Sequence, residues 1–448
     1  PYKDSDNNSY IAKKEYPAIC FKLTNSEESI KIIRSIAKTL NIPLNKNRLL
    51  EILDEIDSCC YDDGKPIEIN NRVAAYKDGY IYHLSNNKYL NVSSNGTNLI
   101  NSPPEGVYFC RRAGFQDMDI RESSNKTFVS LLARFNCPKD EKLLLLAWLI
   151  YTVSTPKSEL KPYPILKIQA PAGSGKSVLS GKLIRGLLDA NDNEMINMQR
   201  NPKDIAISAQ NGHVVIYDNL RLISPDVSDV LCQVSTGGSL SSRTLYSNNA
   251  ESTIKMRSAL VLNGIHDYAT ESDLISRCVT IRLKPLVDSQ RQSEAELSRQ
   301  LEIELPEYIH LLHRLAAKIL KTQDSVTVTY KSRMADFALY VAGLEKVIGI
   351  PEGRLQDAYK HNVEQSTIAG VIDDSLYDSL MRFAQQYSKN SPWQGTPKEL
   401  LNSLTLSNQS SSDMPKNAAA MSRRIPMLQS ALTSYGVHID RKSTRLNS

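Results

Sequence analysis

A glycine-rich octapeptide in the middle of the chain has the residue types of a phosphate-binding loop. Residues 170–177 read APAGSGKS, which matches the pattern G-x-x-x-x-G-K-[ST] except that Ala170 stands at the first glycine. In such a loop, backbone amides and the start of the next helix surround phosphate oxygens. The lysine reaches the β- and γ-phosphates, and the hydroxyl of the last residue ligates Mg²⁺. The octapeptide therefore predicts a site for ATP and Mg²⁺.

The residues around the octapeptide predict the required geometry. The apolar run PYPILKIQ (162–169) indicates a strand that enters the loop, and SVLSGKLIRGLL (177–188) indicates a helix that leaves it. Alanine can open the loop if its φ is negative. The alternative is an ordinary strand–turn–helix corner. The predicted nucleotide ligands are Ala170, Pro171, Ala172, Gly173, Ser174, Gly175, Lys176 and Ser177.

Three polar residues follow the loop at the ends of apolar runs or close to one. Asp218 ends HVVIYD, 42 residues after Lys176, and a carboxylate there can hold the Mg²⁺ shell together with Ser177. Asn263 ends SALVLN, where its amide could orient the attacking water. Arg277 follows in DLISRC, where it could stabilise transition-state charge on the nucleotide of a neighbouring subunit. The alternative interpretation is that these residues have no catalytic role, because polar residues at such positions are commonly strand ends, helix caps or surface residues.

The apolar runs alternate with helical patterns, which indicates a parallel α/β core of the P-loop type. A chain of 448 residues is too long for one core. We expect five segments: an N-terminal α+β module (1–125), a helical connector (126–160), the ATPase core (161–288), a helical region (289–390) and a basic winged-helix-like module (391–448). Within the connector, residues 143–153 form an apolar run after a good helix start, which predicts a buried helix rather than a membrane span.

The order of these motifs resembles that of AAA+ ATPases, and among them the superfamily 3-like helicases of viruses and mobile elements. Of these groups, it more closely resembles the ATP-binding proteins of bacterial phages and integrated elements that sit beside a primase or are fused to one. The likeness spans roughly 105–440 and rests on Thr236-Gly-Gly, Arg243-Thr-Leu-Tyr246, Leu262-Asn-Gly-Ile265 and Asp273-Leu-Ile-Ser-Arg277. It implies a ring-shaped ATPase, most simply a hexamer, that acts on DNA in the replication of such an element.

The residue after the strand-end aspartate departs from many AAA+ enzymes. These place a glutamate there as the general base, whereas this chain has Asn219. An amide positions water but cannot accept its proton. Hydrolysis is then slow, or Asp226 or Asp229 serves as the base, and the sequence does not choose between them.

Two regions are candidates for contact with DNA. Residues 238–257 predict a hairpin with its turn at Asn248-Asn249, and in ring helicases that this chain resembles, such hairpins track single-stranded DNA in the channel. The alternative is a solvated, charged sheet edge. The C-terminal module has helix starts at Thr396-Pro397 and Pro415 and a strand pattern after Gly436, so it resembles a winged helix that binds duplex DNA, or else it is a small helical lid or docking module. The candidate contacts are Arg243, Lys255 and Arg257 in the hairpin and Arg423 and Arg424 in the module.

The net charge, the cysteines and the histidines limit the kinds of partner, compartment and metal site that the sequence predicts. The net charge of +5 is modest, and residues 396–448 carry +4 of it, or +1 if the tail 441–448, which resembles a translated adapter, is not native. The seven cysteines have no metal-binding or disulfide spacing, so we expect reduced thiols in a cytoplasmic protein. His310 and His313 lack a third ligand and are interpreted as packing or surface residues. The chain starts at Pro1, as a fragment would.

These observations leave three functional hypotheses. The first is a Mg²⁺-ATP-dependent helicase or translocase on DNA. The second is an initiator or loader that uses ATP as an assembly switch and hardly unwinds, which Asn219 favours. A small-molecule P-loop kinase is the weakest, because the long hairpin and the helical region have no role in it.

Overall fold

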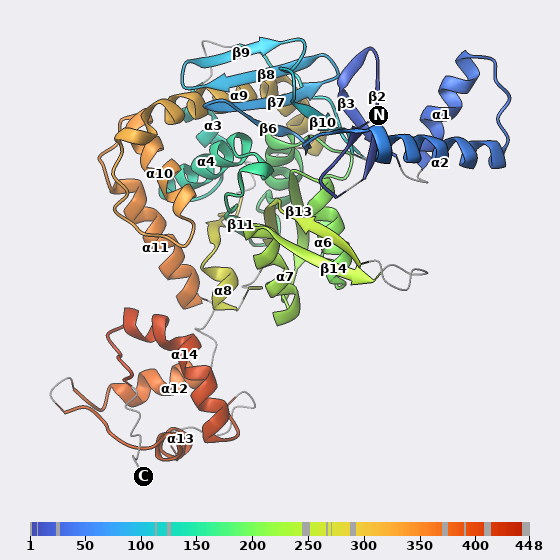
Figure 1. The fold of residues 1–448 in the computed structure, drawn as a ribbon. Helices are drawn as coiled ribbons and strands as arrows, with labels where there is room; N and C mark the ends of the chain where they lie inside the picture. Colours follow the sequence, from blue (N-terminus) through green and yellow to red (C-terminus); the bar gives the residue numbers. More distant parts are fainter. Residues whose placement is uncertain are drawn as a thin grey trace.

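The computed structural model describes most of the chain and shows two layers of sheet around a helical core. The described residues are 2–6, 8–23, 27–112, 114–122, 127–243, 251–265, 268–269, 271–286, 293–369, 375–388, 391–406 and 414–440. Figure 1 shows the N-terminal sheets and the central sheet with the helices that pack on them, and a separate cluster of helices at the C-terminal end.

The N-terminal part contains two sheets and a helical pair. One sheet has the order β4-β1-β2-β3-β10-β5, with strands Tyr2–Lys3 (β1), Ser9–Lys13 (β2), Tyr16–Lys22 (β3), Lys65–Pro66 (β4), Ile69–Asn70 (β5) and Tyr108–Cys110 (β10). Helices Glu27–Thr39 (α1) and Lys46–Asp63 (α2) lie between β3 and β4 in the chain. The other sheet is an antiparallel meander of Val73–Tyr76 (β6), Gly79–Ser85 (β7), Lys88–Ser93 (β8) and Gly96–Ile100 (β9).

The central sheet is parallel, which confirms the predicted α/β core. Its order is β12-β13-β16-β11-β17, with strands Ile165–Gln169 (β11), Ile196–Asn197 (β12), Val214–Leu220 (β13), Ala259–Gly264 (β16) and Cys278–Arg282 (β17). The accompanying helices are Arg185–Leu188 (α5), Pro202–Asn211 (α6), Pro225–Thr236 (α7) and Ser272–Ile275 (α8). Because β11 lies between β16 and β17, the end of β11 is flanked by the carboxyl ends of both neighbours.

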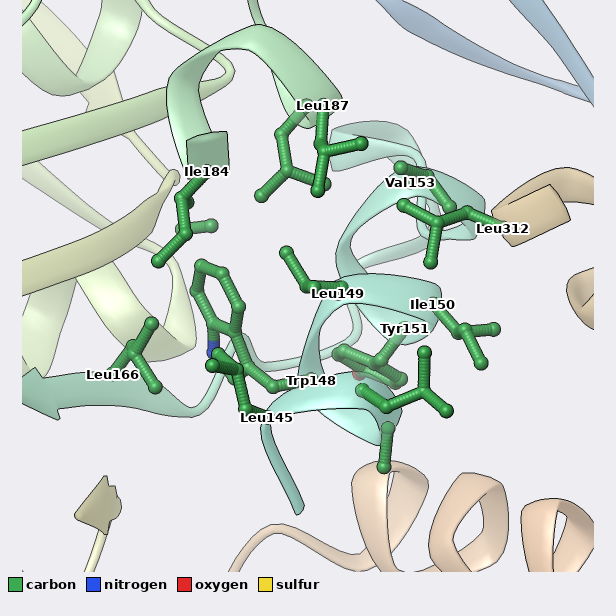
Figure 2. Close-up of a cluster of buried hydrophobic side chains, with 14 of the residues drawn as sticks. Leu145, Trp148, Leu149, Ile150, Tyr151, Val153, Leu166, Ile184, Leu187 and Leu312 are labelled. Carbon is green, nitrogen blue, oxygen red and sulfur yellow. The ribbon is translucent and has the colours of Figure 1, made fainter. Parts of the chain in front are cut away.

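The helix Lys139–Ser154 (α4) lies at the centre of the molecule. Every residue from Leu143 to Ser154 is buried, so the helix has no polar face. It packs against the meander, the central sheet and the helices Phe128–Ala133 (α3), Glu294–Thr322 (α9), Ala335–Ile348 (α10) and Arg354–Ala369 (α11). Figure 2 shows Trp148 and Leu149 of α4 among side chains from β11, from the segment after the glycine-rich loop and from α9. The predicted buried helix is thereby confirmed, and no helix within the described residues is long and apolar enough to cross a membrane.

The C-terminal helices form a core of their own and correct two expectations. Helices Ser375–Ala384 (α12), Pro397–Leu406 (α13) and Ala418–Ser434 (α14) share one apolar cluster. The sequence assigns residues 375–384 to the helical region 289–390, whereas Leu376 and Leu380 of α12 pack with α14, because a helical repeat alone does not show which core a helix joins. The strand expected after Gly436 is not formed in residues 437–440. The tail 441–448 lies outside the described residues.

The buried histidines give the fold a defined response to acid. His213 donates its Nε2 hydrogen to the carbonyl of Thr152 at 2.9 Å, and the His313 Nδ1 is 2.8 Å from the Tyr80 hydroxyl. Burial lowers the pKa of His213 to about 4 and that of His313 to about 3. His313 is therefore a packing residue, as its sequence context predicted.

We predict that the protein loses stability between pH 6.5 and pH 4. Both histidine pKa values are lower in the folded chain than the unfolded value of about 6.5, so the unfolded chain binds protons first as the pH falls. The free energy of unfolding should drop by roughly 2 kcal/mol per histidine between pH 7.5 and pH 5. Urea unfolding at the two pH values, followed by tryptophan fluorescence, measures this. His213→Asn should reduce the difference, and His438→Gln, at an exposed position, should not; equal pH dependence in all three proteins would contradict the assignment.

Candidate nucleotide-binding site

The glycine-rich loop connects β11 to a helical segment, as its sequence predicted. Gly173 and Gly175 have φ values of 72° and 81°, which a side chain would disfavour, and they turn the backbone between strand and helix. Ala170 keeps a negative φ, and its amide donates to the carbonyl of Gly264 at the end of β16. The Ser174 hydroxyl donates to the carbonyl of Pro171 and closes the turn. Alanine at the first position is therefore compatible with the loop.

The helix behind the loop begins with a π-helical segment, Val178–Ile184, before α5. Such wide turns are uncommon and are often found at functional sites. Ser177 precedes this segment and is exposed, so its hydroxyl is open to a ligand. The predicted helix 177–188 is thus confirmed as two consecutive helical segments.

Asp218 lies beside the loop lysine, at the strand end where the sequence placed it. The Lys176 Nζ is 3.8 Å from the Asp218 Oδ1, and the two side chains are 12% and 15% exposed. Asp218 Oδ1 is buried and has no hydrogen-bond partner among the residues that the structure describes. A carboxylate oxygen without a hydrogen-bond donor and an exposed serine hydroxyl are hard oxygen ligands of the kind that Mg²⁺ prefers. These residues therefore fit a magnesium ion held by Ser177 and Asp218.

Asn219 occupies an unusual backbone conformation at the same strand end. Its φ is 57°, and the pairing of β13 with β16 shifts between Tyr217 and Leu220. Asparagine tolerates this left-handed conformation better than most residues, although it still costs on the order of 1 kcal/mol. The bulge leaves Asn219 exposed directly after Asp218. Asp226 and Asp229, the other candidate bases, are exposed residues of α7.

Asn263 is held in one orientation by a residue that the sequence did not single out. It pairs with Ile168 on β11, one residue before the strand ends, and it is completely buried. The Ser180 hydroxyl donates to the carbonyl of Lys176, so its oxygen accepts from the Asn263 Nδ2 at 2.7 Å. Within the described part of the chain, Asn263 Oδ1 has no hydrogen-bond partner. The amide oxygen is thereby left to accept a hydrogen bond. The one sequence signal for Ser180 was its position four residues after Lys176 on a helix.

Arg277 lies at the opposite end of the central sheet. Its carbonyl accepts from the amide of Ile165 at the start of β11, and it immediately precedes β17. Five residues of strand separate this level from the loop, or about 17 Å. The Arg277 Nη1 is 2.6 Å from Asp273 Oδ2, and the residue is only 7% exposed. Asp273 also binds Arg333, a half-exposed residue that the sequence did not indicate. Arg277 is thus remote from its own loop, as expected, and paired.

A second arginine of β17 lies at the loop end and escaped the sequence analysis. Arg282 is the register partner of Gln169, the last residue of β11. Its guanidinium donates to Glu141 on α4 and to Ser366 on α11. The sequence signal was a cation at the end of an apolar strand, which also occurs at ordinary strand ends. Its contacts indicate that Arg282 fixes the helices beside the loop.

The candidate DNA contacts of the hairpin differ in their exposure and in the contacts they make within the protein. The predicted hairpin is present as Gly238–Arg243 (β14) and Glu251–Met256 (β15), and the Arg243 side chain and the Asn248-Asn249 turn lie outside the described residues. Lys255 is exposed and contacts Asp6 at 2.7 Å. Arg257 donates to the carbonyls of Lys157 and Thr236 at the base of the hairpin, so its contacts are structural.

The two arginines of the C-terminal module lie on α14. Arg423 is exposed and Arg424 is partly buried. Their helix packs on α12 and α13, which leaves Arg423 open to a partner outside the protein.

Comparison with known proteins identifies related sequences along most of the chain. Residues 126–366 match the family model described as the actinomycete integrative conjugative element replication protein, and residues 377–448 match the AICE RepA C-terminal domain. The first match alone covers more than half of the chain. No curated protein matches the sequence.

Two solved structures have a partly similar fold at low sequence identity. One is described as "SCCmec type IV Cch - active helicase", with 12% identity, 82% of this chain and 74% of that chain covered, and a TM-score of 0.40. The other is described as the apo NrS-1 C terminal region, with 12% identity, 79% and 86% coverage, and a TM-score of 0.34. Likeness at this level assigns no residue and no activity.

We predict that Ser180→Ala lowers nucleotide turnover more than nucleotide affinity. The change removes the acceptor that orients the Asn263 amide, and a misplaced catalytic group lowers the rate of the chemical step. We expect kcat for ATP to fall on the order of tenfold while KM changes by less than about twofold. Ser228→Ala is the matched control, because it removes a buried serine hydroxyl that has no partner. A Ser180→Ala enzyme with wild-type kcat would show that Ser180 does not position Asn263.

Proposed function

The chain belongs to the family of replication proteins of actinomycete integrative conjugative elements, and on that premise we propose that it is a Mg²⁺-ATP-dependent AAA+-type ATPase that acts on DNA as a helicase or translocase. One observation carries the proposal. The loop lysine Lys176, the strand-end acid Asp218 and the buried amide of Asn263 meet at the carboxyl edge of one parallel sheet. Ligands of open parallel sheets bind at this edge.

The residues of the site have separate roles in this proposal. The loop amides and Lys176 bind the β- and γ-phosphates of ATP. Ser177 and Asp218 would hold Mg²⁺, which neutralises charge that develops on the phosphates. The Asn263 amide oxygen, left open by the bond to Ser180, accepts a hydrogen bond from the attacking water.

Asn219 supports a second candidate function, an ATP-dependent initiator or loader. It stands where a glutamate base is expected, and it has an amide, which takes up no proton. A protein with this site binds ATP well and hydrolyses it slowly, so ATP binding itself controls assembly on DNA. Strand-displacement and DNA-stimulated ATPase assays distinguish the two functions. Unwinding of DNA supports the helicase or translocase. ATP-dependent DNA binding without unwinding supports the initiator or loader.

The partners follow from the same proposal. The hairpin β14–β15 takes single-stranded DNA in a central channel through Arg243 and Lys255, and α14 contacts duplex DNA through Arg423 and Arg424. A primase of the same element is the expected protein partner. The ATPase works as a hexameric ring, because Arg277 acts on the nucleotide of a neighbouring subunit.

We predict that Lys176→Ala abolishes ATP turnover and leaves the fold intact. Lys176 contributes a partly exposed charge near Asp218 rather than core packing, so its loss removes phosphate binding without opening a cavity. ATP binding by fluorescence titration and ATPase rate should both fall to background, while the thermal unfolding midpoint stays within about 2 °C. Lys203→Ala, at an exposed position of α6, is the control and should behave like wild type. Undiminished ATP affinity and turnover in Lys176→Ala would rule out the nucleotide site.

We predict that Arg277→Ala binds ATP normally but loses turnover by about 10³-fold, as loss of an arginine finger does. To act on the nucleotide of a neighbouring subunit, the Arg277 guanidinium must leave Asp273. Asp273 then still has Arg333 as an ion-pair partner. Mixing Arg277→Ala with Lys176→Ala should restore activity, because mixed rings contain junctions with one intact loop and one intact arginine. Arg333→Ala is the control, since it also removes an ion pair with Asp273 but should keep its turnover. Absence of rescue on mixing, or hydrolysis by a strict monomer, would refute the trans role.

A further inference from the structure

The C-terminal half of α9 carries a row of cations whose side chains have no ion-pair partner among the described residues. Arg314, Lys318 and Lys321 are exposed, and within the described residues none of their side chains forms a hydrogen bond or an ion pair. The acidic residues of α9 all precede them in the helix, at Glu294, Glu296, Glu302, Glu304 and Glu307. Positive charge is therefore concentrated on one half of a long helix.

These cations line a groove between α9 and the turn that joins β8 to β9. The groove has a volume of about 620 Å³, and residues 94–97 form its other wall with polar, uncharged side chains. Glu122 is the one carboxylate among the lining residues, and its Oε1 is 3.8 Å from His310. Burial lowers the pKa of His310, so this histidine is neutral at pH 7. The groove thus holds three cations and one carboxylate.

The helix itself does not account for the row. Cations near a helix C-terminus are favoured by the macrodipole, and this accounts for Lys318 and Lys321, because α9 ends at Thr322. Arg314 lies two turns earlier, beyond the reach of that effect. The three residues are spaced about 6 Å and 4.5 Å along the axis, so their charges repel one another. An external polyanion would relieve this repulsion.

We propose that this groove binds a DNA phosphodiester backbone. A row of cations about 10 Å long matches a ligand with a continuous line of negative charge, and DNA carries one charge per ~1.7 Å of axis. Asn95 and Thr97 on the facing wall add donors of the type that contact phosphate oxygens. Figure 1 shows β9 at the top of the view, far from the hairpin β14. The groove is therefore a second DNA contact outside the candidate channel, and it rests on the DNA-binding part of the proposed function.

Neutralising two of the cations tests the proposal by its salt dependence. The double variant Arg314→Gln/Lys318→Gln is compared with wild type and with Lys203→Gln/Lys360→Gln, which loses the same charge from exposed positions of α6 and α11. Affinity for fluorescein-labelled 30-base-pair duplex and for the single strand is measured by anisotropy from 50 to 300 mM salt. Each lost contact should reduce the slope of log K against log salt by ~0.9 for duplex and ~0.7 for single strands.

We expect the salt slope of the groove variant to fall by the amount that corresponds to about two lost contacts on at least one form of DNA. We expect its affinity for that DNA to fall on the order of tenfold. Its ATPase activity in the absence of DNA should be unchanged. The form affected identifies whether duplex or single strand lies in the groove. The proposal would be overturned if the salt slope of the groove variant equalled that of the control variant on both forms of DNA. It would also be overturned if an acidic peptide bound in the groove and left the affinity of the protein for DNA unchanged. If wild type binds no DNA, the proposed function itself fails; if only the slope is unchanged, the groove alone fails.

Discussion

Burial of α4 on all sides from Leu143 to its end at Ser154 is the constraint on which the rest of the structure depends. A helix without a polar face must be enclosed on all sides, so the meander, the central sheet and α9, α10 and α11 surround one element. Two polar side chains of α4 find hydrogen-bond partners in the segment that precedes β11. The Trp148 Nε1 donates to the carbonyl of Pro164, and the Tyr151 hydroxyl donates to that of Pro162, each at 2.7 Å. Both bonds hold the chain that enters β11, so the core helix also sets the position of the phosphate loop.

A buried ion pair joins the N-terminal meander to the part of the chain that contains the central sheet. The Arg72 Nε is 2.9 Å from Asp189 Oδ1, and the other arginine nitrogens donate to the carbonyls of His83, Gln116 and Ala190. Asp189 Oδ2 accepts the amides of His213 and Val214, where β13 begins. Removal of one partner from such a buried pair typically costs 3–5 kcal/mol. The N-terminal part showed no chemistry in its sequence, yet one of its arginines fixes the start of the strand that ends at Asp218.

Sequence patterns were sufficient to predict the glycine-rich loop and its strands, because each of these features depends only on residues that are adjacent in the sequence. A glycine at a required positive φ, as at Gly173 and Gly175, and a run of apolar residues can be recognised without knowing what lies beside them. The orienting bond from Asn263 to Ser180 joins residues 83 positions apart and depends on the π-helical turn, so it has no local pattern. For the same reason the sequence placed α12 in the wrong core. Kinship with replication proteins of mobile elements, inferred from the order of motifs, is confirmed by the family match.

Parallel strand geometry both assembles the candidate site and limits it. The carboxyl ends of β11, β13 and β16 bring the loop, Asp218 and Asn263 together, because parallel strands that share a register end at one edge. The same geometry puts Arg277 at the start of β17, about 17 Å away along a rigid strand. No side-chain movement covers that distance, since an extended arginine reaches only about 7 Å from its backbone. If Arg277 takes part in hydrolysis, the sheet itself requires a second subunit. Arg282, at the other end of β17, binds Glu141 of α4 and Ser366 of α11, so a shift of this strand would move both the loop edge and Arg277.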